Sequence, residues 1–117
     1  MKLWIDDIRN PERFLGKEKA EGVVWKKEAW SARNYLFKEV NEDIDTLYLD
    51  NFLGDRQITG ESMLETLAFR LRKFPKLKKI YLHSSDDRVV ARCIEKYKEK
   101  LAEHGIELID AEYREHD

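Results

Sequence analysis

Cysteine is nearly absent from this chain of 117 residues, which contains only Cys93. A lone cysteine excludes an internal disulfide and suits a reducing compartment. Because Cys93 falls on the apolar side of a predicted helix, we expect it to be packed in the core rather than to act as a nucleophile. Long apolar runs are also lacking, since none approaches the roughly 20 residues of a membrane-spanning helix. Met1 and Lys2 lead directly into a predicted strand, with no leader between them. We therefore expect a cytoplasmic protein without membrane contact.

The sequence also lacks a clear excess of charge of either sign. Lys and Arg number 22 against 24 Asp and Glu, so the formal net charge is −2. Such a chain has no strong field with which to attract nucleic acid or an anionic membrane. We interpret one basic group as a solvated face, and it consists of Arg70, Arg72, Lys73, Lys76, Lys78 and Lys79. Double-stranded nucleic acid is therefore not an expected partner.

Short apolar runs alternate along the chain with segments of helical periodicity. We predict strands at 2–6, 23–25, 46–50, 80–83 and 106–109. Helices are predicted at 29–40, from about 60 to 74, and from about 86 to 104. Thr59 is the expected cap of the second helix, and Ser84 or Ser85 of the third. Residues 8–22 predict a loop with at most one helical turn around residues 13–15.

This alternation predicts one α/β domain over residues 1–117, with a loose acidic tail at 111–117. Right-handed crossovers leave few arrangements of a five-stranded parallel sheet. The flavodoxin-like strand order 2-1-3-4-5, with helices on both faces in three layers, is the commonest of them. The first crossover helix is expected to be missing or short. In this order strands 1, 3 and 4 are neighbours.

Polar side chains follow each of these three central strands. They are Asp6 and Asp7, then Asp50, then His83, Ser84 and Ser85. Ligands of parallel α/β sheets bind beyond the carboxyl ends of the strands. We therefore predict that the functional site lies at this edge of the sheet.

Three clustered carboxylates, Asp6, Asp7 and Asp50, need a counter-charge if all are to stay ionised. Oxygen ligands of this kind suit Mg²⁺ or Mn²⁺. Because magnesium usually shares an oxygen with a phosphate, a phosphorylated small molecule or nucleotide is the expected ligand. Arg9 and Ser84 are candidates for binding its phosphoryl group.

His83 is a candidate proton donor or acceptor, or a metal ligand. Each of these residues also has an ordinary structural explanation. Aspartates at strand ends often form turns, a serine such as Ser85 often caps a helix, and a single histidine is often buried with its hydrogen bonds satisfied. His104 and His116 are given no role.

The arrangement resembles a receiver domain, in which an acidic pair follows strand 1, an aspartate follows strand 3 and a Ser or Thr follows strand 4. The resemblance implies that Asp6 and Asp7 bind a metal, that Asp50 accepts a phosphoryl group and that Ser84 contacts it. Receivers also have a lysine after strand 5, whereas residues 109–112 here read Ile-Asp-Ala-Glu.

A narrower family, the cyclic-phosphate-processing receiver-like domains of phages and bacteria, is more similar. Its pattern is an acidic pair followed by Arg and Pro, then Asp-His-Asp-Leu-Gly, Thr-Gly and His-Ser-x-Asn. The corresponding segments here are Asp6-Asp7-Ile8-Arg9-Asn10-Pro11, Asp50-Asn51-Phe52-Leu53-Gly54, Thr59-Gly60 and His83-Ser84-Ser85-Asp86. This resemblance implies metal-dependent processing of a cyclic phosphate on a nucleotide or RNA end.

Three positions depart from that pattern. Asn51 replaces a histidine, Phe52 replaces an aspartate, and Asp86 replaces the asparagine. The first two changes would remove one imidazole and one carboxylate from the loop after strand 3. We expect Asn51 to contact the substrate in place of the histidine.

Three functions follow from these residues. The first is an enzyme in which Asp6, Asp7 and Asp50 hold the metal, with Asp50 also a possible nucleophile, and His83 exchanges a proton. The second is a signalling receiver that is phosphorylated on Asp50 and binds a protein partner. The third is a degenerate receiver-like module that binds a partner or a nucleotide without catalysis, which the changes at Asn51 and Phe52 favour.

Overall fold

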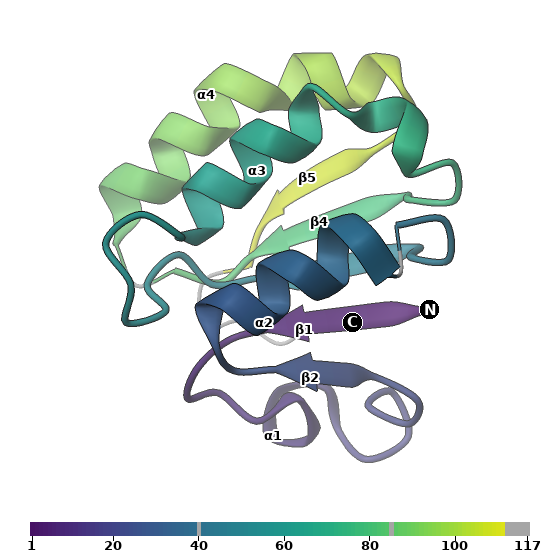
Figure 1. The fold of residues 1–117 in the computed structure, drawn as a ribbon, viewed down its shortest axis with the longest axis vertical. Helices are drawn as coiled ribbons and strands as arrows, with labels where there is room; N and C mark the ends of the chain where they lie inside the picture. The colour runs from purple at the N-terminus through teal and green to yellow at the C-terminus, as the bar shows by residue number, and fades with distance from the viewer. Residues whose placement is uncertain (40, 85, 112–117) are drawn as a thin grey trace.

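The computed structural model describes residues 1–39, 41–84 and 86–111, and it places them in a five-stranded parallel sheet with helices on both faces (Figure 1). The strand order is β2-β1-β3-β4-β5, which confirms the predicted flavodoxin-like arrangement. The elements are β1 Lys2–Ile5, α1 Pro11–Leu15, β2 Val24–Lys26, α2 Ala29–Asn34, η1 Tyr35–Glu39, β3 Thr46–Leu49, α3 Gly60–Ala68, η2 Leu71–Lys73, β4 Lys79–Leu82, α4 Asp87–Glu103 and β5 Glu107–Asp110. Most of the predicted tail, residues 112–117, lies outside the described residues.

Alternate residues of the strands supply two separate hydrophobic clusters. Leu3 and Ile5 belong to the larger cluster, under α2, α3 and α4, which lie together on one face in Figure 1. Trp4 and Tyr48 belong to the smaller cluster on the opposite face, where Leu15 of α1 joins them. Successive side chains of a strand point to opposite faces, so a sheet covered on both sides needs apolar residues at both parities.

Local sequence explains why the first crossover helix is short. The Asn10 side chain accepts a hydrogen bond from the Glu12 amide, and Pro11 occupies the first turn, so the helix starts there. Gly16 follows with φ of 84°, a conformation that favours glycine and ends the helix after five residues. The prediction of a stunted first helix is confirmed.

The helix predicted at 29–40 is divided in the structure. It is α-helical over α2 and then widens into a π-helix, η1. The wider turn lets Tyr35 and Phe37 pack against the core beside the fully buried Leu36. Val40, the predicted end of this helix, lies outside the described residues.

The cap predicted at Ser84 for the last helix is wrong, and Ser85 lies outside the described residues. Asp86, which was expected within the first turn, is the N-cap, and its carboxylate accepts a hydrogen bond from the Arg88 amide. The Ser84 hydroxyl oxygen accepts from the Asp86 amide, one step earlier in the chain. The strands β2 and β5 are each displaced by one residue from the predicted ranges.

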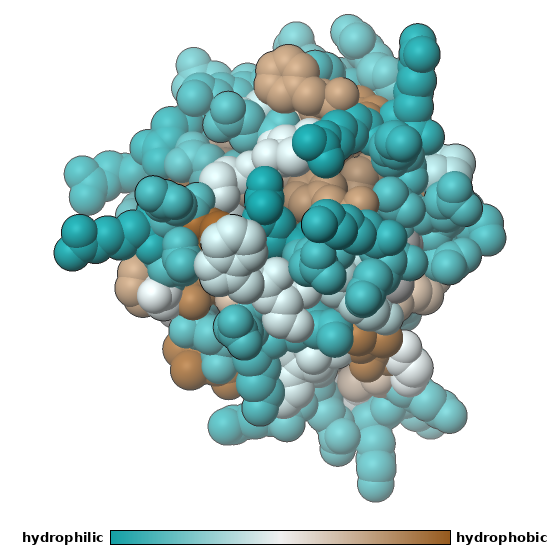
Figure 2. All heavy atoms as spheres, in the orientation of Figure 1, coloured by the Kyte–Doolittle hydropathy of each residue, from teal (hydrophilic) through white to brown (hydrophobic). Residues whose placement is uncertain are grey.

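Cys93 is 2% exposed in the buried face of α4, and burial raises the pKa of its thiol to about 11. It is therefore a core residue, as predicted. The helix-covered face of the molecule is mostly hydrophilic, with small separate apolar areas (Figure 2). Within residues 1–39, 41–84 and 86–111, no helix is both long enough and apolar enough to cross a membrane.

Candidate metal centre at the carboxyl edge of the sheet

The strand register brings three of the predicted site residues side by side. Ile5, Leu49 and Leu82 are partners across β1, β3 and β4. The next residue of each strand is Asp6, Asp50 or His83. The pairing continues into these positions, because the Asp50 amide donates to the Ile5 carbonyl and the His83 amide to the Leu49 carbonyl, both at 2.9 Å. All three residues are thus held by sheet hydrogen bonds as well as by packing.

The three carboxylates come together as the sequence indicated. Asp6, Asp7 and Asp50 each offer an oxygen atom, and these atoms lie within 4.8 Å of one another. Asp6 is fully buried and Asp50 is 5% exposed, whereas Asp7 is partly exposed. Asp6 and Asp50 are therefore held by the sheet, and Asp7 stands on the solvent side.

Asp6 is the most constrained of the three. One carboxylate oxygen accepts from the amides of Ile8 and Arg9, at 3.0 and 2.9 Å. Burial alone would raise the pKa of Asp6, but the His83 imidazole 3.8 Å away and the hydrogen bonds from these two amides outweigh it and hold the pKa below its ordinary value. Asp6 is therefore the carboxylate that stays ionised without a metal.

The pKa of Asp50 is shifted in the opposite direction to that of Asp6. Burial raises its pKa to about 7, and the neighbouring negative charges of Asp6 and Asp7 add to the rise. Arg9 works against this increase without cancelling it. The cluster therefore holds one carboxylate that is only half ionised near neutral pH when no metal is bound.

Arg9 places a positive charge inside the cluster. Its Nη1 lies 3.0 Å from Asp6 Oδ2 and 3.4 Å from Asp50 Oδ1, and it donates to the His83 carbonyl at 3.2 Å. The side chain is 9% exposed. In this structure the residue predicted to bind a phosphoryl group is thus turned toward the carboxylates, and three carboxylates with one guanidinium leave a net charge of −2 when all are ionised.

The His83 ring borders this cluster on the face of the sheet that carries Trp4 and Tyr48. Its ring meets Trp4 edge-on at a centroid distance of 4.3 Å, and its Nδ1 is 3.8 Å from Asp6 Oδ2. The side chain is 2% exposed, and burial lowers its pKa despite the nearby Asp6. The imidazole is therefore neutral near pH 7 and borders the carboxylate cluster rather than the solvent.

The sequence of residues 1–100 matches the family described as the cyclic-phosphate processing receiver domain. The chain belongs to this family. No curated protein matches the chain. The family match and the strand order together confirm the predicted resemblance and the receiver-like fold.

Two other predicted site residues of this receiver domain already take part in local hydrogen bonds. The Ser84 hydroxyl accepts from the Asp86 amide at 3.1 Å, which leaves its hydrogen available for donation. The Asn51 side-chain oxygen accepts from the Glu61 amide at 2.9 Å, and this bond ties the start of α3 to the carboxyl edge of the sheet. The amide nitrogen of Asn51 keeps two donors, so a contact with substrate remains a prediction.

Trp4 and Trp25 hold the loop after β1 in place. From the sequence they were predicted only to be strand residues. Trp4 Nε1 donates to the Arg9 carbonyl and Trp25 Nε1 donates to the Asp6 carbonyl, each at 2.8 Å. Buried indole N–H groups need an acceptor, so a tryptophan inside a strand next to a polar loop is a signal for such a bond. These bonds fix the loop that carries Asp7 and Arg9.

The family's Thr-Gly motif has a clear structural reason in this receiver domain. Thr59 caps α3 in a capping box with Ser62, as the sequence predicted in part. Gly60 packs directly on the peptide after Asp50, so an added Cβ would collide with the Asp50 carbonyl oxygen and would lie 2.8 Å from the Asn51 Cα. Helix α3 can approach the peptide between Asp50 and Asn51 this closely only because residue 60 lacks a side chain.

Gly60→Ala should therefore destabilise the domain by about 3 kcal/mol, the upper part of the usual range for overpacking. The measurement is urea unfolding of both proteins. Gly22→Ala is the matched control, because Gly22 has open space around the position of a Cβ but a φ of 79°, which costs about 1–2 kcal/mol. Equal losses in the two variants would contradict the close contact between α3 and the Asp50 peptide.

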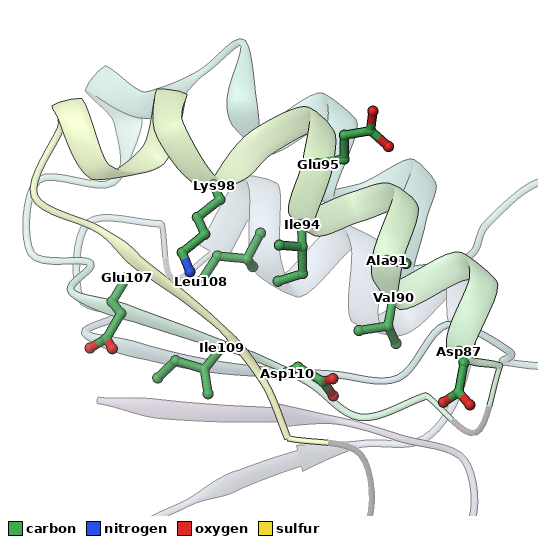
Figure 3. Close-up of a pocket in the computed structure, with 10 residues that line it drawn as sticks. All are labelled: Asp87, Val90, Ala91, Ile94, Glu95, Lys98, Glu107, Leu108, Ile109 and Asp110. Carbon is green, nitrogen blue, oxygen red and sulfur yellow. The ribbon is translucent and has the colours of Figure 1, made fainter.

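A second hollow lies along the edge of the sheet, between α4 and β5 (Figure 3). Val90, Ile94 and Leu108 fill its floor, and the Glu95 carboxylate points away from it. Its charged lining residues include Asp87, Lys98 and Asp110, but they do not form a group of three metal-binding side chains like that of Asp6, Asp7 and Asp50. The candidate site of this receiver domain is therefore the carboxylate cluster.

Proposed function

We propose that this domain is a metal-dependent phosphoesterase that opens a cyclic phosphate on a nucleotide or an RNA end. The observation that carries the proposal is the set of three carboxylate oxygens within 4.8 Å of one another at the carboxyl edge of the sheet. The family to which the chain belongs processes cyclic phosphates. A hard divalent cation and a phosphoryl group are the ligands that such a cluster favours.

The residues present fit Mg²⁺ or Mn²⁺. Asp6, Asp7 and Asp50 would supply three oxygen ligands, and the net charge of −2 that remains beside Arg9 equals that of one divalent cation in magnitude. When bound, such a metal polarises the phosphoryl group and offsets the charge that develops on it. Asp6 and Asp50, fixed by the sheet, would set the position of the phosphorus atom.

Ring opening forms one bond from an attacking oxygen to phosphorus and breaks one ring P–O bond. The attacking water loses a proton and the departing ring oxygen gains one. His83 is neutral and can take up a proton, and its approach to Asp6 gives that proton a path to the edge of the site. Ser84 would donate its hydroxyl hydrogen to a phosphoryl oxygen, and Arg9 could add a second donor if the metal displaces it from Asp50.

A panel of 2′,3′- and 3′,5′-cyclic nucleotides, assayed with Mn²⁺ and with Mg²⁺, tests this proposal. We expect a linear nucleotide monophosphate as the product from at least one of them. Chelation by EDTA should stop the reaction, and the exposed variant Asp43→Asn should not. Absence of product from the whole panel, with either metal, would contradict the proposal.

A non-catalytic, receiver-like binding module is the second candidate. Phe52 is 70% exposed where the family has its second aspartate, and Arg9 already neutralises part of the cluster. Under this proposal the metal edge would bind a nucleotide or a protein partner without turnover. Tight binding of a cyclic nucleotide in calorimetry, without product, would favour this candidate over the enzyme.

Asp50 should not retain a phosphoryl group after incubation with acetyl phosphate and Mg²⁺. An ordinary receiver uses a lysine after strand 5 to contact the phosphoryl group, and residues 109–112 here offer none. Intact-mass spectrometry is the measurement, with Asp50→Ala as the control. A stable phosphate adduct that is present in the parent and absent from Asp50→Ala would instead support a signalling receiver.

A further inference from the structure

The carboxyl ends of α3 and α4 meet at the opposite end of the molecule from the metal centre (Figure 1). A hollow between them is lined by Ala68, Phe69, Arg70, Leu71, Arg72, Lys73, Lys100 and His104. No acidic side chain belongs to this lining. We call Phe69, Arg70, Arg72, Lys73 and Lys100 the basic platform.

The cations of the platform are not used by the fold in ion pairs. Among the residues that the structure describes, none of its four cations lies within 4.0 Å of a carboxylate oxygen. A cation at each helix end would satisfy the helix dipoles. Arg70 also lies over the Phe37 ring, 5.7 Å from its centroid, whereas no ion pair or ring contact is seen for Arg72 and Lys73 among the described residues.

An aromatic ring stands among these cations. Phe69 is 76% exposed, and Lys100 Nζ lies 4.3 Å from its ring centroid. Phe69 follows α3 directly, and its ring contacts Lys100 of α4 but is not part of the hydrophobic core. An exposed aromatic ring beside arginine and lysine side chains is the combination that binds single-stranded nucleic acid, through base stacking and phosphate contacts.

We propose that the basic platform binds a single-stranded polynucleotide, with Phe69 stacked on a base and Arg70, Arg72, Lys73 and Lys100 on the phosphates. A duplex would offer Phe69 no base to stack on, because the bases of a duplex are already stacked on one another. The whole-chain charge of −2 argued against a nucleic-acid surface. That sum does not describe the local arrangement, in which Asp6, Asp7 and Asp50 cluster at the carboxyl edge of the sheet and four cations belong to the lining of one hollow. The proposal does not depend on the phosphoester chemistry.

Fluorescence anisotropy with a fluorescein-labelled ten-nucleotide oligouridylate, at low salt and with EDTA, tests the proposal without involving the metal centre. Four phosphate contacts predict that log K falls with log salt concentration with a slope of about −3. Arg72→Glu/Lys73→Glu should weaken binding at least tenfold. The control Arg13→Glu/Lys17→Glu makes the same change in net charge on exposed residues around α1, and it should bind like the parent. Equal weakening by both doubles would overturn the proposal, as would failure of the parent to bind.

Phe69→Ala separates a polynucleotide site from a general polyanion site. Loss of one stacked base should weaken oligonucleotide binding about tenfold, while affinity for a heparin fragment should not change. Because Phe69 is so exposed, the variant should melt at the parent's temperature. An oligodeoxyuridylate of the same length tests whether the sugar matters, and binding of either strand supports the proposal. Heparin binding without oligonucleotide binding, or an equally tight duplex, would overturn it.

Discussion

Replacing His83 by alanine should lower kcat for cyclic-phosphate hydrolysis about a hundredfold, within the usual range for a positioned proton-transfer group. The affinity for Mn²⁺ should change little, because the three carboxylates of the cluster remain. His83 is the histidine that borders the carboxylate cluster, since Asn51 stands where the family pattern has another. Initial rates over a range of substrate and metal concentrations give both quantities.

His83→Gln distinguishes proton transfer from orientation. Glutamine can still offer a hydrogen bond to Asp6 but cannot exchange a proton near neutral pH. If the imidazole transfers the proton, the two variants should be equally slow. If it only orients Asp6 from its buried position, His83→Gln should keep most of the parent's kcat. The exposed variant His104→Ala is the control, and full activity in His83→Ala would exclude both roles.

Replacing Asp50 by asparagine should stabilise the metal-free domain at pH 8 and leave it nearly unchanged at pH 4. The folded state raises the pKa of Asp50 from 3.8 to about 7. Between these values the folded protein holds a proton that the unfolded chain has released, so the free energy of unfolding falls as pH rises. The full cost at high pH is about 4 kcal/mol. Relaxation of the site reduces this figure, and we expect a gain of about 2 kcal/mol in Asp50→Asn.

At pH 8, bound metal should make the parent more stable than Asp50→Asn. At 100 times its dissociation constant, a cation that binds only the folded state adds about 2.7 kcal/mol to the parent. Asp50→Asn should gain much less, and Asp50→Ala should lose both the metal response and turnover. Urea unfolding at pH 4 and pH 8, with EDTA or with Mn²⁺, measures all four states, and Asp43→Asn serves as the exposed control. A parent whose stability does not respond to millimolar Mn²⁺, or an Asp50→Asn that is less stable at pH 8, would contradict the carboxylate repulsion.

Both predictions depend on how Arg9 behaves. Without metal it neutralises part of the cluster through Asp6 and Asp50. A cation that occupied the carboxylate oxygens of Asp6 and Asp50 would compete with Arg9 for them, and the released guanidinium could then pair with a phosphate. The role predicted for Arg9 in substrate binding is therefore compatible with its position in the metal-free structure, provided that the metal releases it.

The sequence by itself determined the fold and the location of the candidate site. Apolar runs that end in Asp6, Asp50 and His83, separated by helical segments, leave few ways to build a parallel sheet. In a parallel sheet the ends of neighbouring strands meet, so residues far apart in the chain are brought together by topology alone. The match of these positions to the receiver pattern strengthened the same conclusion.

Only the tertiary structure decided what surrounds each group. Whether Arg9 points to a carboxylate or to solvent, and whether His83 faces Trp4 or the substrate, depends on side-chain packing between different strands. Periodicity specifies a face of an element, but it does not specify the neighbour that a side chain meets. The same limit applies to charge: the sum over the chain is only −2, while the fold brings three carboxylates together at the carboxyl edge and four cations around the hollow beside Phe69. Electrostatic interactions act through space and weaken with distance, so their effect could be read only from the folded molecule.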